Sequence, residues 1–168
     1  MRKPLQEIND QTVIRSYLEK NGFCYLSVVD GDKPYTVPLN YGFSLTDNGE
    51  LTLYFHTSIG GRLYDIIQSK GGQDIKAAFA LAEMNGLLKS IKGVCEWDVD
   101  YKSIMGEGVL NTLTEYVDRE KALRVLMDGF GAEPGYEFVP ARIAAVMVYE
   151  FKVVHDYHMK KSKQEIVQ

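Results

Sequence analysis

Residues 35–65 constrain the fold most, because they read as two alternating strands that run directly into a helix opened by glycine. In residues 35–43 every second side chain is apolar, so these side chains share one face of a strand. A polar turn at residues 47–49 leads to a second alternating run at residues 51–56. Strands joined by so short a turn pair antiparallel. The sequence therefore predicts a hairpin followed by a helix.

Strand-like segments recur through the rest of the chain. They lie at residues 23–29, 75–82, 97–113 and 143–154. The last is apolar on both faces, which is typical of a central, fully buried strand. We expect Met84-Asn85-Gly86 to turn the chain after the strand at residues 75–82.

Helices are few. Asp10 is a candidate N-cap for a helix that ends at Asn21-Gly22, and Asp118 is a candidate N-cap for a second helix. The Lys-rich tail beyond Tyr157 is expected to fray or to dock on a partner. Because hairpin-connected strands dominate, we predict an α+β, mainly β fold. It would be an antiparallel barrel with peripheral helices, in one domain over residues 1–168.

Charge and hydropathy exclude several classes of protein. A net charge of −4 and a pI near 5.4 argue against a nucleic-acid surface. No apolar run approaches the roughly 20 residues that a membrane-spanning helix needs, and the first residues lack the apolar core of a secretory signal. Cys24 and Cys95 show no paired spacing and are expected to be buried, reduced thiols. We therefore expect a cytoplasmic protein.

Gly60-Gly61-Arg62 is a candidate phosphate site. A helix N-terminus offers unpaired N–H groups, glycines let an anion approach closely, and a guanidinium supplies the countercharge. The alternative is a solvated arginine in the first turn of a helix. Against that alternative, a cation at a helix N-terminus opposes the helix dipole, so its position is easier to explain if an anion lies between them.

Pro38 interrupts an otherwise regular strand pattern. Proline removes a donor from the hydrogen-bond ladder, which predicts an edge strand or a bulge at this position. The edge could be bare, or a flat ring could lie against the backbone of residues 37–41. Both interpretations stay open on the sequence alone.

His56 falls on the face opposite Leu53 and Phe55, so we expect it to point away from the core. A lone histidine is often structural or solvated, but this one directly precedes the candidate phosphate site. Tyr101 and Ser103 share one strand face and could offer hydroxyls to a ring, although aromatic residues here also suit core or interface packing. Neither a catalytic triad nor the ligand spacing of a metal site is visible, and no metal is expected.

The order of these motifs resembles the pyridoxamine 5′-phosphate oxidase-like flavin-binding split barrels, and within them the nitroimidazole-resistance (Nim) branch. The matching segments run from about Asn9 to Val154. They are Tyr35-Thr-Val-Pro-Leu-Asn-Tyr-Gly-Phe43, Leu53-Tyr-Phe-His-Thr57 with Gly61-Arg62, and Cys95-Glu-Trp97 followed by Tyr101-Lys-Ser-Ile-Met-Gly-Glu-Gly108.

The resemblance implies a Greek-key split barrel that forms a homodimer, with FMN rather than FAD bound at the subunit seam. It implies that Arg62 holds the phosphate and that His56 is the candidate catalytic residue. The cofactor-binding residues that it implies are Val37, Pro38, Leu39, Asn40, Tyr41, Phe55, His56, Thr57, Gly61, Arg62, Tyr101, Ser103 and Ile104.

Two departures from the family pattern bear on the substrate. Oxidases of the vitamin B6 phosphates carry an Arg-Lys pair at the phosphate loop, where this chain has Gly61-Arg62. Their C-terminal Arg/His substrate set is not found in Val-Val-His-Asp-Tyr-His. Both differences argue against oxidation of pyridoxamine phosphate.

Two functions remain as hypotheses, beside the alternative of a dimeric barrel that binds no cofactor. The first is an FMN-dependent oxidoreductase that passes two electrons to a small acceptor such as a nitroimidazole or another nitroaromatic. The second is a flavin- or haem-binding protein that stores or senses its ligand without turnover. A haem would need His56, His155 or His158 as its axial ligand.

Overall fold

The computed structural model describes residues 6–154 and 157–162. Its strands are β1 (Glu7–Ile8), β2 (Cys24–Asp30), β3 (Lys33–Leu39), β4 (Gly42–Leu45), β5 (Leu51–Ser58), β6 (Ile75–Leu88), β7 (Asp98–Thr112), β8 (Val146–Val153) and β9 (His158–Lys161). Its helices are α1 (Gln11–Lys20), α2 (Arg62–Ser69), the 3₁₀ turn η2 (Val94–Glu96), α3 (Tyr116–Gly129) and α4 (Pro140–Ala144).

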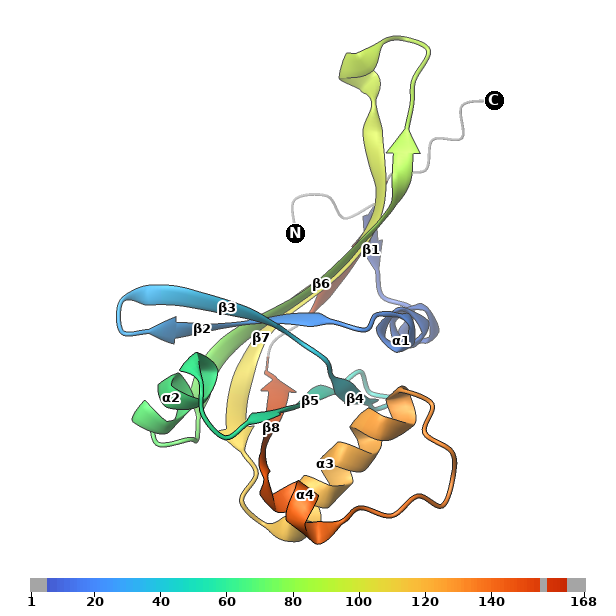
Figure 1. Ribbon diagram of the computed structural model, residues 1–168. Coiled ribbons are helices and arrows are strands. Elements are labelled where there is room, and N and C mark those ends of the chain that lie inside the picture. Colours follow the sequence, from blue (N-terminus) through green and yellow to red (C-terminus); the bar gives the residue numbers. More distant parts are fainter. Residues whose placement is uncertain (1–5, 155–156, 163–168) are drawn as a thin grey trace.

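All strand pairs are antiparallel, and the main sheet has the order β3-β2-β6-β7-β8-β5-β4. The chain therefore leaves one edge of the sheet at β3 and enters the opposite edge at β4 (Figure 1). This open, mainly antiparallel sheet with helices around it is the split barrel that the sequence predicts. The helices α3 and α4 pack beside β4, β5 and β8.

The core lies on one side of the β2-β6-β7 layer because side chains alternate across each strand. On β2 the inward residues include Leu26, and on β6 they include Phe79 and Leu81, all almost completely buried. On β7 the inward residues include Ile104 and Leu110, which are completely buried. The outward residues of these strands are exposed or half-buried, so the opposite side of this layer is an outer face.

The predicted strand at residues 35–43 is wrong in one respect, because it divides into β3 and β4. Two side-chain bonds hold the break against the end of α1. The Asn40 amide donates to the Gly22 carbonyl at 2.9 Å, and the Tyr41 hydroxyl donates to the Leu18 carbonyl at 2.6 Å. The prediction for Pro38 is confirmed, since β3 is an edge strand that pairs, within the described part of the chain, with β2 alone.

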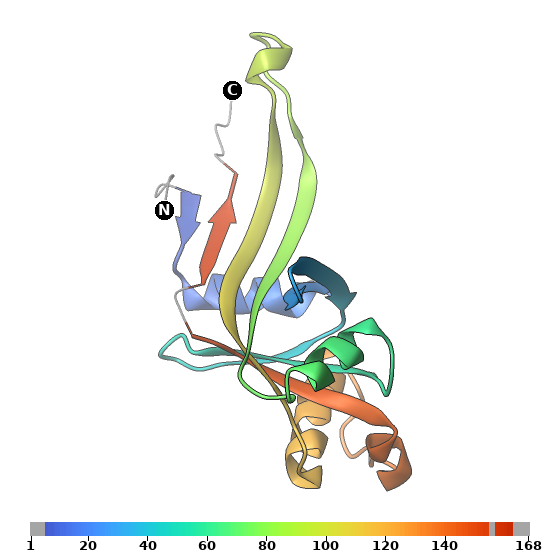
Figure 2. The ribbon, with the colours of Figure 1, turned by 90° about the vertical axis from the view of Figure 1, so that its left-hand side faces the viewer.

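The predicted turn at Met84-Asn85-Gly86 is also wrong. The strand continues through this segment, and only its register shifts, by a bulge between Met84 and Gly86. β6 and β7 therefore form one long hairpin whose distal part projects away from the rest of the molecule, as both ribbon views show (Figures 1 and 2). The sequence pattern does predict β7 itself, over nearly its full length.

The ends of the other elements agree in part with the expectations. Asp10 caps α1 through a 2.8 Å bond from the Thr12 N–H, as predicted. The N-cap of α3 is Glu115, so Asp118 lies in the first turn instead. β8 is central as expected, but it is not fully buried, since Lys152 is exposed. It starts at Val146, because the residues before it form α4.

The start of the Lys-rich tail forms a strand within its own chain, so it is not frayed, whereas residues 163–168 of the tail lie outside the described residues. As β9, residues 158–161 pair with β1 and β7 of the same chain.

The two cysteines differ in environment. Cys24 is buried and Cys95 is exposed, so the expectation of two buried thiols holds for Cys24 alone. Burial raises the pKa of the Cys24 thiol to about 12. Among the described residues, no helix has the length and apolar character to cross a membrane.

We predict that Gly42→Ala destabilises the protein by about 2 kcal/mol or more, because overpacking a close contact forces the backbone to move. A Cβ at this position of β4 would lie 2.7 Å from the Leu126 backbone of α3. The matched control is Gly129→Ala, where a Cβ meets nothing within 4 Å. Urea unfolding of the two variants measures the difference, and equal stabilities would contradict the prediction.

Candidate functional site

The loop between β5 and α2 has the geometry of an anion site. Gly60 and Gly61 have φ angles of 110° and 91°, which an L side chain rarely adopts, and a Cβ on either would meet nothing within 4 Å. Gly61 is the N-cap of α2, and it has no side chain to accept from the N–H groups of the first turn. Open space therefore lies beside N–H groups of the first turn of α2 that have no side-chain cap.

Arg62 has partners of its own within the chain. Its guanidinium donates two bonds, of 3.0 and 3.1 Å, to one carboxylate oxygen of Asp30 at the end of β2. It also lies over the Tyr35 ring, 4.6 Å from the centroid. Both members of the ion pair are about half exposed, at 54% and 42%, so the pair is accessible to a solute.

The outer face of the sheet brings Pro38 into one row with residues from four other strands. Pro38 pairs with Tyr25, Tyr25 with Ala80, Ala80 with Met105, and Met105 with His158. Directly paired residues point to the same side of a sheet, so this row is continuous across β3, β2, β6, β7 and β9. Ala80, in the middle of the row, has a small side chain, so the surface of the sheet is low at this point. The outer face also holds a hollow of about 460 Å³ beside Ala78, Ala80 and Met105.

Tyr101 and Ser103 stand on the same outer face, farther along β7. Three strand spacings separate β3 from β7, and Ser103 is two residues beyond the row of Pro38. By strand geometry this places Ser103 about 16 Å and Tyr101 about 20 Å from Pro38. One flavin ring cannot touch Pro38 and also these two residues of the same chain.

His56 lies on the other side of β5 from Thr57. It pairs with Val148, which is buried in a small apolar cluster with Ala122, Leu123 and Ile143 of α3 and α4. The ring is half-buried, and its Nδ1 atom has no hydrogen-bond partner among the described residues. Burial lowers the pKa of His56 below its ordinary value of 6.5. The imidazole of His56 is therefore neutral at pH 7.

Several of the predicted cofactor residues point into the protein. Phe55 and Ile104 have no exposed surface, and Tyr41 is 5% exposed with its hydroxyl occupied by Leu18. Val37 and Leu39 pack partly against the core. For these five residues the backbone, rather than the side chain, is what a ligand could meet.

Thr57 and Asn40 are engaged inside the chain. The Thr57 hydroxyl lies 3.3 Å from the hydroxyl of Tyr149, and the Asn40 amide binds Gly22. The structure thus divides the predicted residues into separate groups: Gly61 and Arg62 in the loop before α2, Val37, Pro38 and Leu39 on the edge strand β3, and Tyr101 and Ser103 on the outer face of β7. Asn40 and Tyr41 lie in the break after β3, Phe55, His56 and Thr57 lie on β5, and Ile104 lies in the core.

Sequence reasoning missed Asp30 and Tyr25. Asp30 is the last residue of β2, next to the tight turn to β3, where an aspartate is explained by its preference for turns. Tyr25 alternates out of a strand that otherwise predicts core packing. The signal for Tyr25 was the period of two, which places it opposite Cys24 and Leu26.

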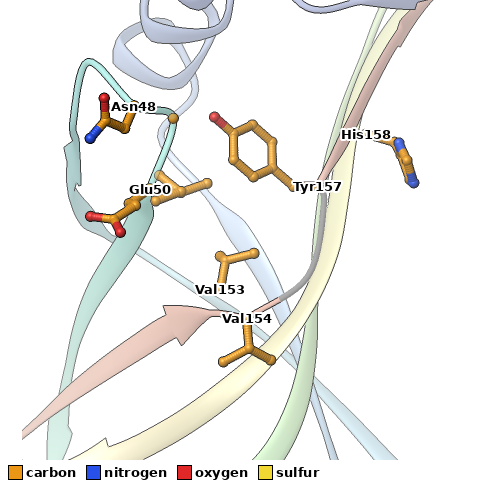
Figure 3. Close-up of a pocket in the computed structure, with 8 residues that line it drawn as sticks. Asn48, Glu50, Val153, Val154, Tyr157 and His158 are labelled. Carbon is orange, nitrogen blue, oxygen red and sulfur yellow. The ribbon is translucent and has the colours of Figure 1, made fainter.

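Another groove, of about 570 Å³, lies apart from the predicted residues. It runs between the β4–β5 turn and the segment joining β8 to β9, and its lining includes Asn48, Glu50 and Tyr157 (Figure 3). Tyr157 points into it and donates to Gln11 at 3.1 Å, whereas the His158 ring lies across the strand. None of the predicted cofactor residues lines this groove.

Comparison with solved structures shows the same fold in several proteins. A protein of Bacteroides thetaiotaomicron assigned to 5-nitroimidazole antibiotic resistance aligns with a TM-score of 0.71 and 20% identity, over 92% of this chain and 86% of that one. The flavocytochrome Anf3 of Azotobacter vinelandii gives 0.74 and 17%, over 96% and 72%. The FAD and haem binding protein of Mycobacterium smegmatis gives 0.76 and 17%, over 94% and 74%.

Comparison with curated protein sequences gives no match. The sequence profile of one family, described as pyridoxamine 5′-phosphate oxidase, matches residues 10–157. This match covers most of the chain and confirms the resemblance that the motifs carry. The chain belongs to the pyridoxamine 5′-phosphate oxidase family.

Proposed function

We propose that this protein binds FMN and acts as an oxidoreductase toward a small acceptor such as a nitroaromatic. The observation that carries the proposal is the position of the glycine loop and Arg62 beside β3, the edge strand that holds Pro38. Arg62 stacks on Tyr35, and Pro38 is three residues farther along the same strand, about 10 Å away. An anion site at one end of a strand and an open strand edge at the other suit a ligand with a phosphate tail and a flat ring.

The phosphate would compete with Asp30 for Arg62. A phosphate near pH 7 carries close to two negative charges, and the guanidinium can meet two of its oxygens. The N–H groups of the first turn of α2 add donors that a carboxylate on β2 does not use. We therefore expect the ligand to turn Arg62 from Asp30 toward the loop.

The ring would lie on the edge of β3, with a second copy of the chain on its other side. Because Tyr101 and Ser103 are too far from Pro38 within one chain, they reach a ring at Pro38 only from the partner of a homodimer. The outer face that bears these residues also exposes apolar side chains, Tyr25 at 48% and Met105 at 49%. Exposed apolar surface of this kind is typical of an interface.

The flavin supplies the redox chemistry when bound, by accepting a hydride and passing on two electrons. The chain contributes position and charge. Arg62 fixes the tail, the backbone of residues 37–41 orients the ring, and a face covered by a partner excludes water. His56, our candidate catalytic residue, enters the proposal as a neutral imidazole whose Nδ1 atom has no hydrogen-bond partner among the described residues.

The similar structures support a flavin ligand. Two of the three carry the words flavocytochrome and FAD and haem binding in their names, and the third is assigned to nitroimidazole resistance. We propose FMN rather than FAD because the positive charge of Arg62 suits a terminal phosphate. We also propose a cytoplasmic location, because the two free cysteines fit a reducing compartment.

We predict that Arg62→Ala weakens FMN binding at least about tenfold, because a charge-assisted bond to phosphate contributes about 1.5–3 kcal/mol. Titration of each protein with FMN and with riboflavin, followed by flavin fluorescence, measures the effect. Riboflavin lacks the phosphate, so its affinity should be equal in the two proteins.

Asp30→Asn provides the opposite change at the same place. It removes the competing carboxylate without removing Arg62, so FMN binding should strengthen and riboflavin binding should stay unchanged. An FMN affinity that Arg62→Ala leaves intact would contradict the phosphate assignment.

We predict that the FMN-loaded protein oxidises NADH or NADPH in the presence of a nitroimidazole, with loss of the nitro-group absorbance. A stopped-flow assay with each nucleotide, with and without acceptor, tests this. Tight FMN binding without acceptor reduction would instead favour the second hypothesis, a flavin-binding protein that stores or senses its ligand.

We predict that His56 makes the fold less stable in acid. The unfolded chain binds a proton at the ordinary histidine pKa, whereas burial lowers the pKa of His56 in the folded protein. Stability should therefore be fully present above about pH 6.5 and fall as the pH drops through the lowered pKa. Urea unfolding between pH 8 and pH 5 should show a shallower loss for His56→Gln than for the parent protein. Parallel curves for the two would contradict this.

A further inference from the structure

β5 separates two buried regions, and the glycine loop turns toward one of them. Thr57 and Phe55 point to one side of β5, and His56 points to the other. On the side of Phe55 lies the main core, to which α2 contributes its buried side chains, including Leu63 and Ile67. The glycine loop between β5 and α2 must therefore carry the chain to the side of Thr57, away from the side of His56.

Tyr149 of β8 stands beside Thr57 on this side of the sheet. It pairs with Phe55 across the ladder and has no exposed surface. Its hydroxyl lies 3.3 Å from the Thr57 hydroxyl, which is its one hydrogen-bond partner among the described residues. Burial raises the pKa of Tyr149, and the nearby Tyr64 in the first turn of α2 raises it further. Three hydroxyl-bearing side chains thus gather where β5, β8 and the start of α2 meet.

The direction of each hydrogen bond follows from the number of protons. The Thr57 hydroxyl has one proton, which it donates to the Ser58 carbonyl at 3.1 Å. It cannot donate to Tyr149 at the same time, so Tyr149 is the donor of that bond and Thr57 is the acceptor. Because burial raises the pKa of Tyr149 above its ordinary value of 10.0, the phenol keeps its proton at pH 7. Tyr149 therefore remains a donor to Thr57 throughout the neutral range.

Thr57 is the member of the pair that a solute can reach. It is half-buried, whereas Tyr149 is completely buried. Only Ser58 and Ile59 separate it from Gly60, where a Cβ would meet nothing within 4 Å. A hydroxyl proton rotates about its C–O bond to suit the acceptor that is present. The Thr57 proton can therefore leave the Ser58 carbonyl for an acceptor in the open space of the loop.

We infer that Tyr149 is a positioning residue for the anion site and that it acts through Thr57. The inference rests on the phosphate site of the proposed function. When an anion enters the glycine loop, the Thr57 hydroxyl turns its proton from the Ser58 carbonyl to an oxygen of the anion. Tyr149 continues to donate to the Thr57 oxygen, and a hydroxyl that accepts one hydrogen bond is a stronger donor in the next.

This arrangement favours a terminal phosphate over an uncharged tail. A phosphate monoester offers three terminal oxygens as acceptors, and the site offers three kinds of donor. These are the Arg62 guanidinium, the N–H groups of the first turn of α2, and the Thr57 hydroxyl. The 3.3 Å between Tyr149 and Thr57 is longer than the roughly 2.7–2.8 Å that is usual between hydroxyls. We expect this distance to shorten when the Thr57 proton turns to the anion.

The test is a double-mutant cycle of Tyr149→Phe and Thr57→Val. The affinities for FMN and for riboflavin are measured for the parent protein, both single variants and the double variant. Each substitution removes a hydroxyl and keeps the shape of the side chain, and Thr57→Ser restores the hydroxyl. The matched control is Tyr157→Phe, which removes a half-buried hydroxyl that donates to Gln11 at 3.1 Å, outside the glycine loop.

We expect Tyr149→Phe to weaken FMN binding about fivefold, the typical effect of one neutral hydrogen bond, and to leave riboflavin binding unchanged. Thr57→Val should weaken FMN binding at least as much. The double variant should match Thr57→Val, because Tyr149 acts only through Thr57. Thr57→Ser and the control Tyr157→Phe should bind FMN as the parent does.

Losses that add in the double variant, or that appear equally with riboflavin, would show a general effect on the fold and overturn the inference. An FMN affinity that Tyr149→Phe leaves unchanged while Arg62→Ala weakens it would also overturn the inference, and the phosphate site would stand. If neither Arg62→Ala nor Thr57→Val changes the FMN affinity, the phosphate site fails and the inference fails with it.

Discussion

The alternation of side chains across the β2-β6-β7 layer is the constraint on which the rest of the structure depends. The inward positions within the barrel, such as Leu26, Phe79 and Ile104, are buried in its core. The same period of two fixes what remains on the outer face, since a one-residue slip would exchange the two sets. Pro38, Tyr101 and Ser103 share that outer face because the core residues beside them are buried.

The second constraint is electrostatic and local. Arg62 stands at the N-terminus of a helix, where a cation is disfavoured, and the chain balances it with Asp30 and the Tyr35 ring. Asp30 and Tyr35 both lie outside the glycine loop, so they leave the N–H groups of the first turn of α2 available to another anion. An exposed ion pair contributes little to stability, which makes it easy for a phosphate to displace. This separation between a satisfied arginine and an open loop is what a binding site needs.

Local patterns predicted much of the fold from the sequence. The cap at Asp10, the edge position of Pro38 and the central β8 follow from residue chemistry that acts over a few positions. The errors came from long-range contacts. The break after Leu39 depends on bonds from Asn40 and Tyr41 to α1, and the strand through Met84-Asn85-Gly86 is stabilised by its partner β7, neither of which a local pattern contains. Loop residues with turn propensity also fit a bulge, and only the neighbouring strand decides between them.

The residues of the candidate site likewise divide into those that a local pattern predicts and those that depend on contacts distant in the sequence. Gly61 and Arg62 were visible because a helix start has a sequence signature, whereas Asp30 is 32 residues away from its partner. Phe55, Tyr41 and Ile104 were named for their place in a motif, and the structure buries their side chains. His56 was expected to face away from the core, and it does so, but it faces the layer of α3 and α4.

A crystal structure of the protein grown with FMN tests the central claim most directly. The account predicts the phosphate between the Gly60-Gly61 loop and the Arg62 guanidinium, and the ring against the backbone of residues 37–41. It also predicts Tyr101 and Ser103 of a second copy on the other side of that ring. A flavin bound elsewhere, or a loop closed by side chains with the phosphate absent from Arg62, would contradict it.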